Sequence, residues 1–304
     1  MSVGGSPSNA TIDGFLLVDK PSGWTSHDVV AKTRGMARQK KVGHAGTLDP
    51  MATGLLVLGL GRATRLMRYI QGGVKEYTAT AQFGVATDTL DADGAVIMRE
   101  PMPVTQADVE AVAERFVGTI QQVPPMVSAK KIGGKRLYEL ARAGEEVERQ
   151  PATVTIHHLE ITDFAPSDYP LVSFTVRCSK GTYVRTLADD MAAALGGRAH
   201  LTELRRTRNG ALSVDDAHSL ETLQTAADEG RFAELVLSPA DGLGDLASIV
   251  VDEESAQAVR NGVPFPRSTF PDADGVVCML ADGGDLLAVY RAEGARVAPE
   301  VVLS

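Results

Sequence analysis

The residue whose type and surroundings most clearly suggest chemistry is Asp49, in the stretch GHAGTLDP from Gly43 to Pro50. A carboxylate can act as a nucleophile or as a base, but Asp before Pro is also a common way to open a turn. Between residues 29 and 75 there are nine Lys and Arg, and Asp49 is the one acid. Glycines in this stretch let the backbone approach a ligand closely, and Pro50 disfavours the α region at Asp49. The sequence therefore predicts a carboxylate on a loop within a positively charged segment.

Two further segments carry residues that would complete a site around such a carboxylate. SKGTYVRT holds Lys180, Tyr183 and Arg185 with no acid among them, and Tyr77 follows the basic block directly in KEYTA. A site that acts on a nucleobase needs a carboxylate, a guanidinium that holds it, and an aromatic ring on which a flipped base stacks. Spacing alone does not bring these residues together, so unrelated surface positions remain the alternative.

Three other patterns are weaker candidates. GLGRATR follows an apolar run, but it lacks the third glycine and the downstream acid of a dinucleotide-binding fingerprint. DTLDADG has carboxylates at calcium-loop-like spacing without the closing Glu, so an Asp-Gly turn explains it better, although Asp88 and Asp91 could still line a site. Cys178 and Cys278 belong to no C-x-x-C pair. We therefore predict neither a metal nor a cofactor.

The candidate residues need secondary structure to position them. GFLLVDK predicts a short strand and a turn, and a Thr-x-x-Asp capping box followed by apolar residues at helical spacing predicts a helix from Ser26 to Arg38. The loop with Asp49 leads into the strand GLLVLGLG. Residues 75–99 alternate apolar and polar side chains around an Asp-Gly pair, which predicts strand, loop and strand.

The segment that follows, up to about residue 210, continues this mixed pattern. TQADVEAVAERFVG, residues 105–118, predicts a capped amphipathic helix. TVTIHHLEITDF and LVSFTVRCSKGTYVRTL are strand-like, RTLADDMAAALGG predicts a helix, and HLTELRRTRNG predicts a strand. Because strands and helices do not alternate regularly, we expect an α+β fold with a central antiparallel, mixed sheet and flanking helices.

Charge divides the chain into two parts. Residues 1–208 hold 25 Lys and Arg against 22 Asp and Glu, a balance of +3, whereas residues 209–304 hold 5 against 17, a balance of −12, and the sum is −9. Basic blocks are either solvated faces or the footprint of a phosphate-backbone binder. The acidic, Gly-rich last part predicts a small β-rich domain at 248–304 after a larger domain at 14–247.

The N-terminal residues and the length of the apolar runs help to predict where in the cell the protein is found. Residues 1–13 lack a basic start and an apolar core, so we expect a disordered leader and not a signal peptide. The longest apolar run, LLVLGLG, is far shorter than the roughly 20 residues of a membrane helix. Together with two cysteines far apart in the sequence, these features predict a cytoplasmic protein with no membrane association.

Five segments, in order, resemble the successive motifs of the TruB family of tRNA pseudouridine synthases. They are DKPSGWTS, VGHAGTLDPMATGLLVLGLGRATR, KEYTATAQFGVATDTLDADG, VPPMVSAKKIGGKRLYELARAG and CSKGTYVRTLADDM. The resemblance runs from about Gly14 to Arg206. It implies a pseudouridine-synthase catalytic domain that needs no cofactor or metal, followed by a PUA-like RNA-binding module at the C-terminus.

The resemblance also implies roles for single residues. The catalytic aspartate falls on Asp49, the base-stacking tyrosine on Tyr77, the arginine that pairs with the carboxylate on Arg185, and the apolar residue beneath the base on Leu204. Residues 126–149 are implied to be a mobile insertion that closes over RNA. Further residues are expected to support the base or to contact RNA: Tyr183, His44, Lys20, Arg62, Lys130, Lys131, Lys135, Arg136 and Lys180.

The implied reaction takes place on uridine 55 in the T-loop of tRNA. The base is flipped out, the C1′–N1 bond is broken, the uracil turns, and C5 is joined to the ribose. The expected partner is the T-loop and T-stem arm of tRNA, bound by a monomer without an obligate protein partner. The alternatives are a non-catalytic tRNA-binding or folding chaperone on the same scaffold, in which Asp49 is dispensable, and an NAD(P) enzyme that uses GLGRATR.

Overall fold

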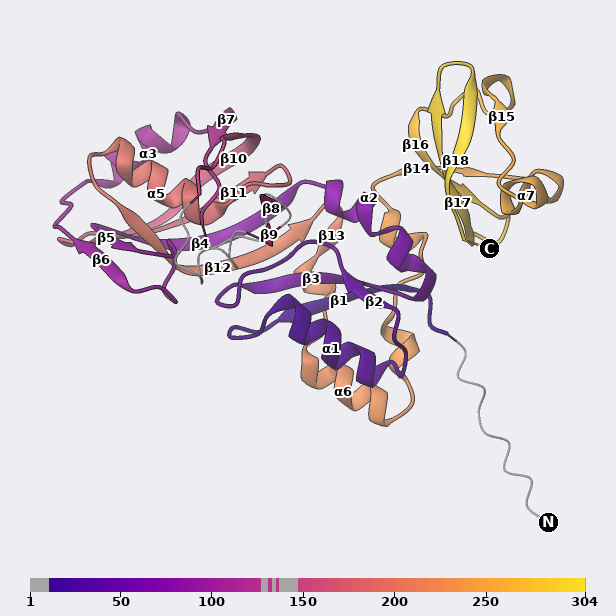
Figure 1. Ribbon diagram of the computed structural model, residues 1–304, viewed down its shortest axis with the longest axis horizontal. Coiled ribbons are helices and arrows are strands. Elements are labelled where there is room, and N and C mark those ends of the chain that lie inside the picture. The colour runs from indigo at the N-terminus through magenta and orange to yellow at the C-terminus, as the bar shows by residue number, and fades with distance from the viewer. Residues whose placement is uncertain (1–10, 127–130, 133–134, 137–146, 304) are drawn as a thin grey trace, which may run out of the picture.

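A nine-stranded mixed sheet forms the body of the N-terminal part of the chain (Figure 1). The structure, a computed structural model, describes residues 11–126, 131–132, 135–136 and 147–303. The strand order is β1-β3-β12-β4-β11-β10-β7, with β2 paired to β3 and β13 to β12, and every pair is antiparallel except β12 with β3. The bounds are β1 Gly14–Lys20, β2 Val42–His44, β3 Thr53–Leu60, β4 Lys75–Phe83, β7 Gly118–Gln122, β10 Ala152–Ala165, β11 Leu171–Cys178, β12 Ala199–Asn209 and β13 Leu212–Ser213. The predicted α+β class is confirmed.

Helices lie along this sheet in two groups. One pair lies by β1 and β3, and another pair packs on β10 and β12 (Figure 1). The first pair is α1 Ser26–Met36 and α6 Leu220–Asp228, and the second is α3 Gln106–Glu114 and α5 Val184–Ala194. Shorter elements connect the strands: η1 Gly61–Arg65, α2 Met67–Gly72 and the hairpin β5 Val85–Thr87 with β6 Val96–Arg99.

Local sequence signals explain where the helices begin and end. The predicted capping box is present at the start of α1, where Thr25 accepts a hydrogen bond from the backbone of Asp28 and the Asp28 side chain accepts one from Thr25. This helix ends at Met36, two residues before the predicted end, because Arg38 has a left-handed φ of 50°.

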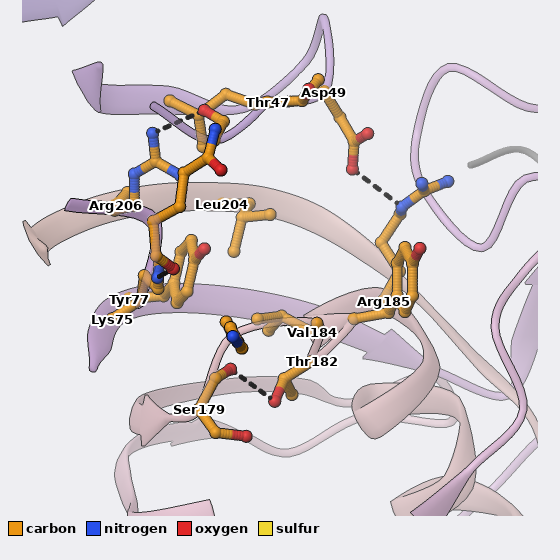
Figure 2. Close-up of a pocket in the computed structure, with 16 residues that line it drawn as sticks. Thr47, Asp49, Lys75, Tyr77, Ser179, Thr182, Val184, Arg185, Leu204 and Arg206 are labelled. Carbon is orange, nitrogen blue, oxygen red and sulfur yellow. Dashed lines mark hydrogen bonds and ion pairs between the residues drawn. The ribbon is translucent and has the colours of Figure 1, made fainter. Parts of the chain in front are cut away.

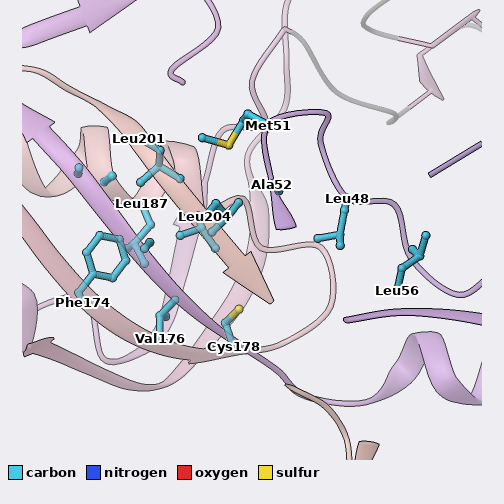
Figure 3. Packing of buried hydrophobic residues seen from close by; sticks show 14 of the residues in the cluster. Leu48, Met51, Ala52, Leu56, Phe174, Val176, Cys178, Leu187, Leu201 and Leu204 are labelled. Atoms are coloured by element: carbon cyan, nitrogen blue, oxygen red, sulfur yellow. The ribbon is translucent and has the colours of Figure 1, made fainter. Parts of the chain in front are cut away.

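The alternation of side chains on the central strands decides which residues reach the site. Ala79 and Phe83 of β4 point into the core, whereas Thr78 is exposed on the other face. Because side chains two apart share a face, Tyr77 lies on the core side. Figure 3 shows how this face packs: Leu187 of α5 lies among side chains of β11 and β12, and Leu204 extends the same cluster.

A separate, curled five-stranded sheet follows. Its strand order is β14-β16-β17-β18-β15, with β14 and β16 parallel. One buried apolar cluster runs through both sheets, since Phe15 of β1 and Leu55 of β3 share it with Val289 and Val301. The two parts of the chain therefore share one apolar cluster, and each also has a buried apolar cluster of its own. The elements are β14 Ala247–Val250, α7 Glu253–Arg260, β15 Phe265–Pro266, β16 Gly275–Leu280, β17 Leu286–Glu293 and β18 Arg296–Val302.

Basic residues of η1 and α2 bind this second sheet. Arg65 donates to the carbonyl oxygen of Val302 at 2.6 Å, and Arg68 pairs with Glu300 at 2.9 Å. The hydroxyl of Tyr69 donates to the same carboxylate at 2.6 Å. Part of the basic block is therefore used to dock the C-terminal sheet.

Parts of the predicted leader and of the predicted insertion lie in the described ranges and make defined contacts. Ile12 exchanges two hydrogen bonds of 3.0 Å with the side chain of Gln39, so the predicted disorder is wrong for residues 11–13, while residues 1–10 lie outside the described residues. Within 126–149, β8 Lys131–Ile132 pairs with β9 Lys135–Arg136 in a short hairpin. The predicted mobility of this insertion concerns mainly residues outside the described ranges. None of the helices in those ranges combines the length and the apolar character needed to cross a membrane.

Candidate active site

A cavity of about 590 Å³ lies where the loop with Asp49 meets β4, β12 and the N-terminal end of α5 (Figure 2). It is built from four segments that are far apart in the sequence. Six residues predicted from the sequence line it: Asp49, Tyr77, Lys180, Tyr183, Arg185 and Leu204.

Lys20 holds the loop that carries Asp49. Its side chain is fully buried, and Nζ donates to the carbonyl oxygens of Pro21 at 2.9 Å, Trp24 at 2.7 Å and Pro50 at 3.1 Å. Burial lowers the pKa of Lys20 to about 8, and the negative charge of Asp49 opposes this decrease. The predicted contact of Lys20 with RNA is therefore wrong, because its three N–H donors are already used by the backbone.

Ser26 holds the other side of the loop. The backbone N–H of Leu48 donates to Oγ of Ser26 at 2.9 Å, and Oγ donates to the carbonyl oxygen of Leu48 at 3.2 Å. The side chain of Leu48 is buried in the core (Figure 3). The loop is thus fixed on both sides of Asp49, and its carboxylate is left facing the cavity (Figure 2).

Arg185, in the first turn of α5, forms ion pairs with two carboxylates. Its Nε lies 3.0 Å from Oδ2 of Asp49, and its Nη1 lies 3.1 Å from Oδ2 of Asp91. The same Nη1 donates to the carbonyl oxygen of Thr89 at 2.7 Å. Since the Arg185 side chain is 3% exposed, its charge and orientation are held from more than one side. Asp91, which the sequence left as a candidate lining residue, is the second anchor of Arg185.

The backbone of the loop before β6 positions this second anchor. Leu90 has a left-handed φ of 63°, which is costly for a residue with a branched side chain. This conformation turns Thr89 and Asp91 toward the same guanidinium nitrogen. The loop is tied to β12 by a hydrogen bond of 3.0 Å from the N–H of Leu201 to the carbonyl oxygen of Leu90.

The surroundings of Asp49 shift its titration. Burial raises the pKa of Asp49, and the adjacent Arg185 guanidinium opposes this increase. The negative charge of Asp91 raises the pKa further, and the positive charge of Lys20 lowers it. The side chain is still 34% exposed, so it opens onto the cavity. A poorly hydrated carboxylate held by a guanidinium is suited to act as a nucleophile or a base.

Tyr77 and Leu204 supply apolar surface in the same cavity. They lie on adjacent strands, β4 and β12, and Figure 2 shows both between the Asp49 loop and the start of α5. Burial raises the pKa of the Tyr77 hydroxyl, and Arg206 opposes this increase through its charge and a hydrogen bond. An aromatic ring beside an aliphatic side chain can hold a planar base by stacking.

Arg206 is a lining residue that the sequence analysis missed. It is 1% exposed, and it donates from Nε to the carbonyl oxygen of Leu55 at 2.7 Å and from Nη2 to that of Gly46 at 3.2 Å. The sequence could have predicted this position. Residues two apart on a strand share a face, and Arg206 stands two residues after Leu204.

Lys75 is a second missed residue. Its Nζ donates to the carbonyl oxygens of Gln71 and Gly73, both at 2.6 Å. Burial lowers the pKa of Lys75 to about 8, and the nearby Arg206 lowers it further. The wall of the cavity beside Tyr77 therefore carries two buried basic groups.

The remaining predicted residues lie in different places. The backbone N–H of Tyr183 donates to Oε1 of Gln122 at 2.7 Å, while Lys180 is exposed at the edge of the cavity. His44 contacts His27 edge to face, with ring centroids 5.2 Å apart, and is not among the residues that line this cavity.

Arg62 lies at the junction of the two sheets. Its Nε pairs with Asp13 at 2.6 Å, and its guanidinium also donates to the carbonyl oxygen of Leu303. Arg62 does not line the cavity, and its expected contact with RNA stays a prediction. Lys130 lies outside the described residues, and the other predicted basic residues of the insertion, Lys131, Lys135 and Arg136, lie on β8 and β9.

Side chains that commonly bind metal ions do not cluster in the described ranges. No group of three or more His, Cys, Asp or Glu in them could hold an ion.

Comparisons with known proteins match most of the chain. Residues 34–184 match the model of the TruB family pseudouridylate synthase N-terminal domain, and residues 185–243 match the tRNA pseudouridylate synthase B C-terminal domain. The chain is 50% identical over 253 residues to the tRNA pseudouridine synthase B of Symbiobacterium thermophilum, which covers 83% of each chain. To that of Thermobifida fusca it is 43% identical over 298 residues, 96% of this chain and 99% of the relative.

Solved structures show the same fold. A Cbf5-Nop10-Gar1 complex aligns with a TM-score of 0.74 and 25% identity over 96% of this chain and 85% of that one. An H/ACA RNP bound to a substrate RNA containing 2′-deoxyuridine aligns with a TM-score of 0.75 and 23% identity over 97% and 86% of the two chains. From the matched domains and the close relatives, the chain belongs to the TruB family of tRNA pseudouridine synthases, which are isomerases.

Proposed function

We propose that this chain converts uridine 55 in the T-loop of tRNA to pseudouridine. The observation that carries the proposal is the ion pair of 3.0 Å between Arg185 Nε and Asp49 Oδ2, in a cavity that Tyr77 and Leu204 also line. A cavity of about 590 Å³ is the size of a small-molecule site. It can take one nucleoside, and a base that is stacked within RNA must be flipped out to enter it.

Each lining residue then has a role in the reaction. Asp49 attacks the nucleoside or stabilises a glycal-type intermediate as the C1′–N1 bond breaks, and Arg185 keeps it ionised and oriented. Tyr77 stacks on the uracil while it turns, with Leu204 beneath it. Tyr77 also takes part in the removal of the C5 proton after C5 has bonded to C1′.

The RNA is bound outside the cavity by exposed positive charge. Lys180 stands at the cavity edge, and the segment 126–149 carries further Lys and Arg that would close over the T-arm. A T-loop base is easier to extrude than a base in a duplex. We further propose that the enzyme works as a monomer in the cytoplasm, without a cofactor; both cysteines are free and buried, as a reducing compartment permits.

The proposal is tested with a tRNA transcript that carries [5-³H]uridine. Wild type should release the tritium of one uridine per tRNA, and Asp49→Asn should release none. Asp88→Asn is the matched control, because Asp88 lies in the neighbouring loop and only accepts a hydrogen bond from the backbone of Ala95.

Two outcomes would contradict parts of the proposal. Equal release by wild type and Asp49→Asn would show that the carboxylate is dispensable, and no release by wild type despite salt-sensitive tRNA binding would favour a folding chaperone. Undiminished release from a transcript with cytidine at position 55 would show that another uridine is the target.

A further inference from the structure

Arg206 is a buried cation without an acidic partner. It is 1% exposed, and its described hydrogen bonds to Leu55 and Gly46 are to neutral carbonyl oxygens. Within the described ranges, no Asp or Glu forms an ion pair with it, in contrast to its neighbour Arg205, which pairs with Asp19 at 2.8 Å. An uncompensated buried charge costs several kcal/mol. A buried positive charge of this kind can stabilise a negative charge that develops beside it during the reaction.

Tyr77 is the group on which that negative charge can develop. Arg206 and Tyr77 are direct partners in the register of β12 and β4, and both line the cavity. The guanidinium of Arg206 is held by hydrogen bonds to two carbonyl oxygens, that of Gly46 in the Asp49 loop and that of Leu55 in β3. Burial raises the pKa of Tyr77, and Arg206 is the group that opposes this most strongly. Without Arg206, Tyr77 would be a poorer proton acceptor.

The last step of the proposed reaction needs such an acceptor. Once C5 of the turned uracil has bonded to C1′, C5 still carries its proton. Removal of that proton puts the C5–H electron pair into the C5=C6 bond and moves the C6=N1 pair onto N1, which takes a proton from water. The oxygen of Tyr77 can accept the C5 proton only as its own proton passes to water.

We infer that Arg206 is a positioning residue that holds the Tyr77 hydroxyl beside C5 and stabilises the negative charge on its oxygen in this step. The inference rests on the proposed function and deepens it. It assigns the late proton removal to a pair, Tyr77 with Arg206, that is separate from the pair of Asp49 with Arg185.

The test compares Arg206→Gln and Arg206→Lys with wild type on tRNA that carries [5-²H]uridine or ordinary uridine. Arg206→Gln should lower kcat by about 100-fold, with KM little changed, and should make proton removal rate-limiting, so that a deuterium isotope effect of about 2 or more appears on kcat. Arg206→Lys keeps the charge and should recover part of kcat. Its activity should increase with pH at a lower pH than the activity of Arg206→Gln. The matched control is Arg205→Gln, because Arg205 is the adjacent residue and is bound to Asp19 away from the cavity.

A double-mutant cycle separates this role from a structural one. In a Tyr77→Phe background, Arg206→Gln should cause no further loss of kcat, because the group through which it acts is gone. The inference is overturned if Arg206→Gln slows Tyr77→Phe as much as it slows wild type, or if kcat falls without an isotope effect. If Arg206→Gln does not fold, Arg206→Lys is carried through the same cycle. If wild type forms no pseudouridine, the proposed function is refuted. The results for the Arg206 variants test the inference only when wild type is active.

Discussion

Lys20 donates a hydrogen bond of 3.1 Å to the carbonyl oxygen of Pro50, the residue directly after Asp49. Through this bond, the end of β1 fixes a loop that is thirty positions further along the chain. This basic side chain thus serves the backbone of the loop and not the RNA.

Lys20→Met should therefore damage the loop more than a loss of surface charge would. Three carbonyl oxygens lose their donor, and each unsatisfied buried group costs about 1–3 kcal/mol, so the free energy of unfolding should fall by at least ~2 kcal/mol. Urea unfolding measures this. Lys41→Met, at an exposed position, is the control and should leave the free energy of unfolding within ~0.5 kcal/mol of wild type.

Asp91→Asn should reduce catalysis without reducing tRNA affinity. Arg185 loses one of its two charged anchors, so it holds Asp49 less well, and a misplaced catalytic group can lower kcat by about 100-fold. Single-turnover rates and filter binding with the same tRNA separate the two effects. A variant that binds tRNA more weakly but reacts at the wild-type rate would show that Asp91 serves the RNA instead.

The acid side of the pH–rate profile should report the environment of Asp49. Because burial raises its pKa, activity should disappear with falling pH at a value above the ordinary pKa of about 3.9. Asp91→Asn removes a negative charge and should move this limb to lower pH, whereas Lys20→Met removes a positive charge and should move it to higher pH. Shifts in the same direction for both variants would contradict this assignment.

The same pKa change predicts how stability depends on pH. A carboxyl group whose pKa is higher in the folded state stabilises the fold when protonated, below its unfolded pKa. That contribution is lost as the pH rises through the folded pKa. The free energy of unfolding of wild type minus that of Asp49→Asn should therefore fall with rising pH over the interval above the ordinary pKa of about 3.9. A difference that rises over this interval would show that Arg185 outweighs burial and that the pKa of Asp49 is lowered.

Glu300→Gln should loosen the C-terminal sheet and leave tRNA binding nearly unchanged. Glu300 accepts hydrogen bonds from Arg68, Tyr69 and Arg291, so its neutralisation should lower the free energy of unfolding by about 1–3 kcal/mol. Glu293→Gln, at an exposed position on β17, is the control. A loss of tRNA affinity greater than tenfold, about 1.4 kcal/mol, would show that this acidic part does support RNA binding. Deleting the sheet is a poorer test, because it would expose the shared apolar cluster of Phe15 and Leu55.

Much of the fold and of the site follows from the sequence alone. The capping box at Thr25, the alternation along β4 and the Gly-rich loop at Asp49 are encoded within a few residues, so local physical chemistry is enough to predict them. The distinctive residues of the motifs likewise placed Asp49, Tyr77 and Arg185 in one site, and the structure brings all three to one cavity.

The tertiary structure alone decided which basic residues are free. Lys20, Arg62 and Arg206 are all basic residues of the first 208 positions, yet Lys20 holds a loop, Arg62 joins the two sheets and Arg206 lies beside Tyr77. The physical reason is that burial and pairing depend on contacts between strands far apart in the chain. Arg206 lies opposite Tyr77 only when β12 has paired with β4. Likewise, Asp91 becomes the second anchor of Arg185 only in the folded protein.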